Sequence, residues 1–283
     1  MTAEALQQLV NETPQIATLP SVYTELSGLI SQSSVNATQL ARVVSMDPGL
    51  TVRLLRMVNS SYYGFDHRID TVSHAVSVIG HQQLKQLALA TTVVHMFRAM
   101  PEHLINMDSY WRHSVATAIA ARTLGRMLGL DKVEYLFVAG LLHGVGSLIV
   151  CINRPHEARR VFIKVKNSDR LLHEVENEVL GFNHADVGGA LMKNWGLSSA
   201  QVEAVEFKHR PNEAPNYAME ACILHLSNLV ACALNMGSVG DVCVPSLDTD
   251  AWSRMGLSDE IMASLVWEIE DQFEDMVRAL TSS

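Results

Sequence analysis

Four histidines are the residues of this chain best suited to chemistry, because each stands where a predicted helix begins or where the chain turns inward. They are His113, His143, His184 and His209. Imidazole nitrogens can hold a transition metal such as zinc. The four lie far apart in the sequence, so only the fold could bring them together, and their spacing alone is a weak metal signal. Taken singly, each is more typical of a surface residue or of a hydrogen-bonded core residue.

His143 lies inside the most apolar stretch of the chain, Tyr135–Val150. A window that is apolar on every face predicts a helix enclosed by protein. The stretch contains His143, Ser147 and three glycines, and it is too short and too polar to span a bilayer. A histidine buried there needs a hydrogen-bond partner or a ligand, because burying an unpaired polar group is costly.

The elements that must position these histidines are predicted to be helices, and no convincing pair of strands is found. The sharpest signal is Asp47-Pro48, an N-cap followed by proline at the first helical position, with Asn59 ending that helix. Pro14 and Pro20 bracket a predicted linker, and Gly237–Asp250 reads as a loop. Further helices are predicted over Ser21–Gln32, Ile69–Gly80, Gln82–Phe97, Trp111–Leu128, Pro155–Lys166, Ser168–Leu180, Asn183–Trp195, Ser198–Lys208, Tyr217–Met236 and Ser258–Leu280.

The composition limits the classes of partner. A net charge of −9 over 283 residues argues against a general nucleic-acid binder, which needs a basic face to displace counterions. The four cysteines form no C-x-x-C pair, which favours reduced thiols in a cytoplasmic protein. The N-terminus shows neither a basic start nor a long apolar run, so no signal peptide is expected. Neither nucleic acid nor a membrane is expected as a partner.

Three motifs around the histidines carry a resemblance to a known superfamily. They are Trp111-Arg-His113, Gly140-Leu-Leu-His143-Gly-Val-Gly146 and Leu224-His-Leu-Ser-Asn228. In this order they resemble the HD superfamily of metal-dependent phosphohydrolases. The resemblance implies that a histidine, a His-Asp pair and a later aspartate hold one or two divalent cations.

A longer set of motifs resembles one branch of that superfamily, the HDOD family, the HD-related output domain of bacterial signalling proteins. The carriers run from Leu19 to about Met236 and comprise Leu19-Pro20, Asp47-Pro-Gly-Leu50, Arg53-Leu-Leu55, Val58-Asn-Ser60, Ala75-Val76, Ile79-Gly80, Gly181-Phe-Asn-His-Ala-Asp-Val-Gly188, Trp195-Gly-Leu197, His209 and Pro211. The resemblance implies a helical fold, and many members of the family lack the complete metal signature and act as regulatory modules.

Two departures from the superfamily pattern decide the expected function. Gly144 follows His143 where the His-Asp pair would have its aspartate, and Asn228 stands where the later aspartate would lie. A hydrolytic metal needs anionic oxygens that hold a hard cation and acidify its bound water. We therefore expect the four histidines to share a cavity without a cofactor, as relics that hydrogen-bond inside the bundle. The alternative is that the imidazoles alone hold a divalent transition metal.

Two basic groups are candidates for partner binding. Arg53 and Arg56 point away from the apolar stripe of their helix, and Arg159, Arg160 and Lys164 give Pro155–Lys166 a basic face. Such a face could receive an acidic partner or a phosphate-bearing signal. A simply solvated helix face is the more common meaning of such a pattern.

The sequence thus predicts an all-α protein in two packed helical halves. An N-terminal half covers residues 1–105, an HD-like bundle covers 106–240, and a loop with a C-terminal helix packed on that bundle covers 241–283. The predicted function is that of a cytoplasmic bacterial regulatory protein that binds protein partners in a signalling pathway and has no catalytic residue. The alternatives are a metal-dependent phosphohydrolase acting on a nucleotide or phosphoester, and a module that senses a nucleotide near His143.

Overall fold

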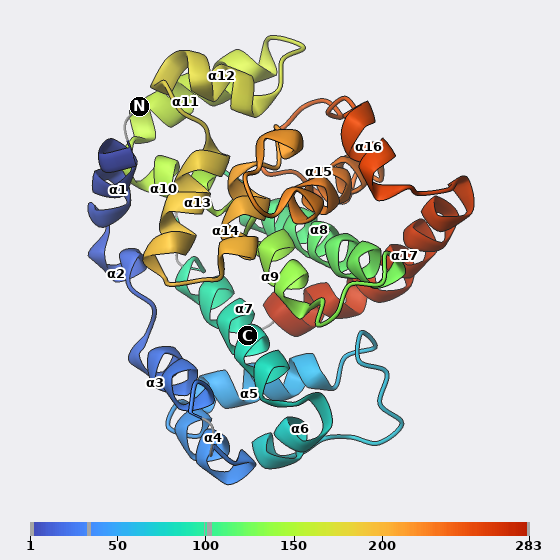
Figure 1. Cartoon of the computed structure of the whole chain (residues 1–283). Coiled ribbons are helices and arrows are strands. Elements are labelled where there is room, and N and C mark those ends of the chain that lie inside the picture. Colours follow the sequence, from blue (N-terminus) through green and yellow to red (C-terminus); the bar gives the residue numbers. More distant parts are fainter. Residues whose placement is uncertain (1–2, 33–34, 99, 101–103, 282–283) are drawn as a thin grey trace. The chain divides into compact units, whose positions relative to one another are not determined.

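The structure, a computed structural model, describes residues 3–32, 35–98, 100 and 104–281 (Figure 1). Within these residues helices are the regular elements and no strand occurs, so the predicted all-α class is confirmed. The chain divides into two compact units. The large unit comprises the described residues of Met1–Thr18 and Met100–Glu270, and the small unit comprises those of Leu19–Ala99 and Asp271–Ser283.

The small unit is built from consecutive short helices whose ends are fixed by side chains. They are α3 (Ser21–Ile30), α4 (Ala37–Val44), α5 (Pro48–Val58), α6 (Val72–Ile79) and α7 (His81–Met96), joined by the last turns of α17 (Asp259–Thr281). The predicted cap is present, because Asp47 Oδ1 accepts a hydrogen bond of 2.9 Å from the Leu50 N–H. Asn59 ends α5 and bonds both the N–H and the carbonyl of Ile69, each at 2.7 Å. These two bonds tie the long loop before α6 to α5.

The large unit surrounds the apolar centre of the chain. Its helices are α1 (Ala3–Asn11), α2 (Pro14–Ala17), α8 (Met107–Met127), α9 (Glu134–Leu142), α10 (Val145–Asn153), α11 (Pro155–Lys166), α12 (Leu172–Leu180), α13 (His184–Asn194), α14 (Ser199–Glu206), α15 (Ala218–Ala233), α16 (Thr249–Met255) and the first turns of α17, with a 3₁₀ turn at Pro211–Glu213. Helix α8 lies against α9 and α15, and α10 lies against α13. His113, His143 and His184 lie on or beside these helices, and His209 follows α14.

The predicted helix over Tyr135–Val150 is two helices in the structure, and the chain breaks at His143 and Gly144. The cause is local. In a continuous helix the Gly140 carbonyl would accept the Gly144 N–H. Here the ring Nδ1 of His143 lies 2.6 Å from that carbonyl and takes it instead.

By length and composition, the stretch Glu134–Asn153 is the one span among the described residues that passes as a membrane candidate. However, 89% of its tested window is buried inside the protein. That degree of burial is typical of a core segment, as the sequence predicted for His143.

The division into units differs from the expected boundaries at both ends. Residues 3–17 lie in the large unit, where Trp195 Nε1 and Asn194 Nδ2 each donate a 2.8 Å hydrogen bond to the end of α2. The expected linker between Pro14 and Pro20 contains α2, which these bonds fix to α13. The end of α17 belongs to the small unit, where Asp275 accepts the Ser61 N–H at 2.5 Å. These bonds join residues that are far apart in the sequence, so composition does not reveal the boundaries.

Candidate functional site: a buried histidine cluster

The first pair of candidate residues joins α8 to the break between α9 and α10. His113 and His143 are both fully buried, with ring centroids 5.2 Å apart. His113 Nε2 lies 3.0 Å from the Asn228 Oδ1 of α15. Since a carbonyl can only accept, His143 donates its Nδ1–H to Gly140, and its Nε2 carries a lone pair. Within the described part of the chain, this Nε2 has no hydrogen-bond partner.

The second pair lies at the start of α13. His184 is fully buried, and its Nδ1 lies 2.6 Å from the Glu176 Oε2 of α12. The same oxygen accepts the His184 backbone N–H at 2.8 Å. The Nε2 atoms of His184 and His209 are 3.2 Å apart, so one ring donates to the other. His173 stacks on His209 with centroids 3.9 Å apart.

We call these five residues the histidine cluster. Its members are His113, His143, His173, His184 and His209. The two pairs are near enough for charge on one to act on the other, because His184 lowers the pKa of His143 and His143 lowers that of His209. The structure therefore brings His113 into ring contact with His143, and His209 into ring contact with His184 and His173. Their role as metal ligands stays a prediction.

A buried lysine supplies positive charge to the cluster. Lys208 is 2% exposed, and its carbonyl accepts a 2.9 Å hydrogen bond from His225 Nδ1. Burial is the largest cause that lowers the pKa of every member of the cluster, and the Lys208 ammonium lowers each one further. The pKa of His113 falls to about 4 and those of His143 and His184 fall well below the usual value. The imidazoles are therefore neutral at pH 7.

Two carboxylates oppose the charge of Lys208. Burial lowers the pKa of Lys208 to about 8, against the raising effects of Asp241 and then Glu176. Burial raises the pKa of Glu176 to about 8, against the His184 N–H and Lys208. Asp241 follows α15 in the loop, and its Oδ1 accepts the Leu172 N–H at 2.8 Å. At pH 7 the ammonium is therefore largely charged, whereas Glu176 is largely protonated and neutral.

The position of the missing carboxylate is closed by packing. A Cβ on Gly144 would lie 2.9 Å from Val239 Cγ1 and 3.2 Å from Tyr110 Cε2. Real Cβ atoms essentially never come within 3.0 Å of such a neighbour, so Val239 would have to shift. The φ of Gly144 is −99°, which any residue adopts, so the glycine is needed for space and not for its backbone conformation. A side chain at position 144 would therefore require Val239 to move.

The residues present do not fit the divalent metal that an HD-type site implies. The unpaired Nε2 of His143 and the carboxylate-oriented His184 are features of a metal ligand set. However, the His184 Nε2 is turned onto His209, His113 Nε2 is turned onto Asn228, and Lys208 adds a positive charge. Among the described residues, no three His, Cys, Asp or Glu side chains are grouped as ligands of one ion.

Sequence reasoning missed Glu176 and Lys208. A signal existed for Glu176, because Leu172, Val175 and Val179 place it on the apolar face of its helix. No comparable signal marks Lys208, since lysine beside a histidine is ordinarily a solvated residue. Asp186, two residues after His184, completes the capping box of Asn183 and pairs with Arg210 at 3.1 Å.

The predicted partner-binding residues fall in both units. On α11, Arg159 and Arg160 are exposed, whereas Lys164 forms an ion pair with Glu178 of α12. On α5, Arg53 folds over the start of its own helix, 3.9 Å from Asp47, with only 17% of its side chain exposed. Arg53 therefore supports the helix end, and the exposed arginines are better placed to meet a partner.

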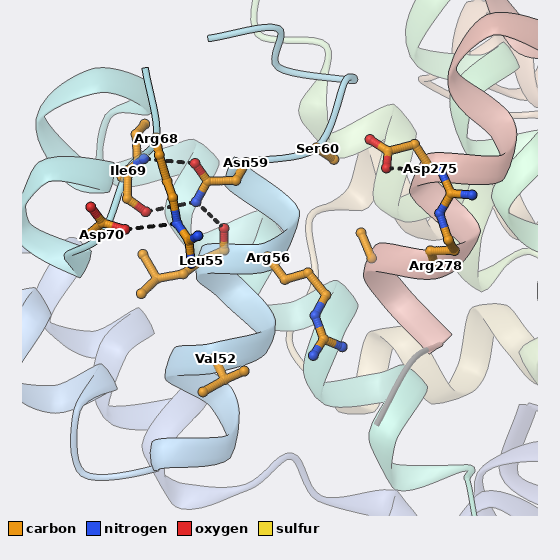
Figure 2. Close-up of a pocket in the computed structure, with 11 residues that line it drawn as sticks. Val52, Leu55, Arg56, Asn59, Ser60, Arg68, Ile69, Asp70, Asp275 and Arg278 are labelled. Carbon is orange, nitrogen blue, oxygen red and sulfur yellow. Dashed lines mark hydrogen bonds and ion pairs between the residues drawn. The ribbon is translucent and has the colours of Figure 1, made fainter. Parts of the chain in front are cut away.

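Arg56 lines a pocket of about 590 Å³ within the small unit (Figure 2). Two further arginines line it, each beside an aspartate. Arg68 lies 2.9 Å from Asp70, and Arg278 lies 3.5 Å from Asp275. Figure 2 shows the Arg56 side chain reaching from α5 toward the C-terminal turns of α17. The pocket lining carries one positive charge more than it carries negative ones.

The bundle of helices around a histidine cluster defines an HD-type helical domain. The sequence model of the HDOD domain matches residues 16–211, which is more than half of the chain, and the chain belongs to the HDOD family. A curated relative from Treponema pallidum (strain Nichols), named only as an uncharacterized protein, is 22% identical over 214 residues. This alignment covers 75% of the chain and 40% of the relative, so the chain spans about two fifths of that protein's length.

Solved structures share the fold. An HDOD domain protein of unknown function from Geobacter sulfurreducens has a TM-score of 0.81 at 22% identity, with both chains covered completely. A protein from Shewanella amazonensis, provisionally named a phosphohydrolase, has a TM-score of 0.77 at 24% identity and 98% coverage of both chains. A protein from Marinobacter aquaeolei, provisionally named a signal transduction protein, has a TM-score of 0.74 at 21% identity, over 93% of this chain and 59% of the other.

Proposed function

We propose that this HDOD protein is a cytoplasmic bacterial regulatory module that binds protein partners in a signalling pathway and does not hydrolyse phosphoesters. The observation that supports the proposal is the close packing at Gly144, where an added Cβ would lie 2.9 Å from Val239 Cγ1 and 3.2 Å from Tyr110 Cε2. Hydrolysis by an HD-type site requires anionic oxygens around the metal. At the later aspartate position, Asn228 offers a neutral oxygen that already contacts His113.

The partner surface that we propose is the pocket around Arg56 in the small unit. Arginine is favoured where a carboxylate is bound, because its planar guanidinium can form two parallel hydrogen bonds. Three arginines line the pocket of a protein whose net charge is −9. Val52 adds an apolar edge and is 55% exposed. The chemistry suits an acidic segment of a partner that also presents an apolar side chain.

The catalytic half of the proposal is tested by metal analysis of the purified protein together with a broad phosphoesterase screen. We expect substoichiometric manganese, iron and magnesium and no turnover. His143→Ala is the matched control, because it removes the unpaired nitrogen of the cluster. Stoichiometric metal with turnover that disappears in His143→Ala would establish the phosphohydrolase alternative and end the proposal.

The partner-binding half is tested by photo-crosslinking in cells. A photoreactive residue replaces Val52, which lines the pocket, or Ile163, which is 53% exposed on α11 beside the second basic group. We expect a discrete crosslinked protein from position 52, and the loss of that product when Arg56→Glu is added. A product that forms only from position 163 would move the partner surface to α11, and the Arg56 pocket would be abandoned.

A further inference from the structure

The most exposed large apolar side chain that the structure describes is Trp267 of α17, with 65% of its surface accessible. The opposite face of the helix is buried, because Leu265 and Ile269 pack into the core of the large unit. Glu260 lies seven residues before Trp267 and Glu270 three residues after it, and both are exposed. Residues at these spacings share one face of a helix. We call Glu260, Trp267 and Glu270 the acidic face.

A second helix of the large unit shows the same pattern with the opposite charge. Ile163 of α11 is 53% exposed, although the other side of this helix packs on α12 through Val161. Three exposed cations lie three or four residues from Ile163 and share its face, namely Arg159, Arg160 and Lys166. We call Ile163 and these three cations the basic face.

The charges of the two helices are complementary. Helix α17 carries seven acidic residues and one basic residue, whereas α11 carries four Lys or Arg residues and one acidic residue. Within the described part of the chain, Glu270, Arg159 and Arg160 have no ion-pair partner. Complementary charges around an apolar anchor favour association, because they orient the two surfaces while the apolar contact slows their separation.

The two faces do not pair within one copy of the chain. Figure 1 shows α11 well apart from the first turns of α17, although both belong to the large unit. Pairing an acidic face with a second acidic face would bring like charges together, and so would pairing two basic faces. The combination that remains is the acidic face of one copy on the basic face of another copy.

We propose that copies of this chain associate head to tail, with Trp267 of one copy packed against Ile163 of the next. When the two helices run antiparallel, Arg159 and Arg160 lie beside Glu270. Such a contact is heterologous, so an assembly keeps one free face at each end unless it closes into a ring. Each added copy brings another Arg56 pocket, which increases the avidity for a partner with repeated acidic segments.

The experiment measures the sedimentation velocity of the purified full chain over a series of concentrations, at low and at high salt. We expect the wild type to form dimers and larger species at low salt. High salt should shift it toward the monomer, because salt screens the attraction between the two faces. Ile163→Asp blocks the basic face and Trp267→Lys blocks the acidic face, and each should weaken association by about tenfold or more. The matched control is Val78→Asp, at an apolar position that is 42% exposed on α6, which should associate as the wild type does.

A mixture of the two blocked variants separates head-to-tail association from a symmetrical dimer. Ile163→Asp keeps an intact acidic face, and Trp267→Lys keeps an intact basic face. The mixture should therefore form a dimer that contains one copy of each variant, and nothing larger. Both positions are exposed, so the variants should fold, and thermal melts check this. If Trp267→Lys does not fold, Glu270→Arg takes its place.

Three results would overturn the proposal. One is a wild type that stays monomeric at every concentration in low salt, which would leave Trp267 to a different protein. Another is association of either blocked variant at the wild-type strength, which a symmetrical dimer through the other face would give. The third is a mixture that stays monomeric. These results do not bear on turnover or on crosslinking at position 52, so the proposed function and the association can fail separately. In cells, a crosslink from position 163 between two copies of this chain counts as association and not as a second partner.

Discussion

Restoring the missing aspartate at position 144 should destabilise the protein and should not create a metal site. The perturbation is Gly144→Asp, alone and with Asn228→Asp. The new Cβ would lie 2.9 Å from Val239 Cγ1 and 3.3 Å from the Tyr110 hydroxyl oxygen. All three residues are buried, so the strain cannot be relieved by turning the side chain into water.

The expected cost has two parts. Overpacking of a closed core costs about 1–3 kcal/mol. A buried charge without a partner costs several more, about 3–5 kcal/mol. We therefore expect Gly144→Asp to lower the free energy of unfolding by at least about 4 kcal/mol. Gly144→Ala separates the two parts, because it adds the Cβ without the charge and should cost about 1–3 kcal/mol.

The assay is urea unfolding followed by circular dichroism, with calorimetric titration of Mn²⁺ and Zn²⁺ into each folded variant. Asn228→Asp alone is the matched control, since it adds a charge with almost no change in shape beside His113. A Gly144→Asp, Asn228→Asp protein that melts near the wild-type temperature and binds Mn²⁺ tightly would refute the reasoning. It would show that Val239 and Tyr110 move aside easily and that the backbone has kept a metal site.

Three further predictions concern stability. Asp47→Ala removes the side-chain cap at the first turn of α5 and should cost about 1 kcal/mol in urea unfolding, and Asp47→Asn should recover most of it. Gly146→Ala should lower the free energy of unfolding by about 3 kcal/mol or more. The reason is that the new Cβ would lie 1.9 Å from the backbone oxygen of His184, so α10 would have to move away from α13. A cost below about 1 kcal/mol would contradict this contact. Lowered from 6.5 to about 4, the His113 pKa makes the folded state lose stability as the pH falls through this range, and the lowered pKa values of His143, His184 and His209 act in the same direction. The raised pKa of Glu176 opposes this loss, because it adds stability as the pH falls from about 8 toward 4.5. We expect urea titrations at stepped pH to show a net loss of stability from pH 6.5 toward pH 4, and a net gain over this range refutes the reasoning.

Local signals in the sequence predicted most of the helices because the structure uses those same signals. Asp47 and Asn36 cap their helices through their own side chains, and the apolar stripe through Leu54 is buried. Such interactions join residues a few positions apart, so periodicity and capping chemistry are enough to find them. The break at His143 escaped notice because it depends on a ring nitrogen that competes for a helix carbonyl. In an unbroken apolar run, the pattern of hydrophobic residues gives no sign of that competition.

The site was predictable only in part, for a related reason. The order of the motifs indicated which histidines come together. The number of residues between them in the sequence says nothing about the distances between their side chains. Glu176 could have been found from its place on an apolar helix face. Lys208 could not have been found in this way. Asp241, which acts on its charge, and His225, which bonds its carbonyl, come from other parts of the chain.

The two replacements at positions 144 and 228 make physical sense together. Without carboxylates at positions 144 and 228, an HD-type cluster would lose the anions that favour a cation, and a vacant space among neutral imidazoles would hold unpaired polar atoms. Gly144 lets Tyr110 and Val239 close part of that space, and Asn228 keeps an acceptor for His113 without charge. Both replacements remove an anionic oxygen that a hydrolytic metal would need, which is the physical basis of the function we propose.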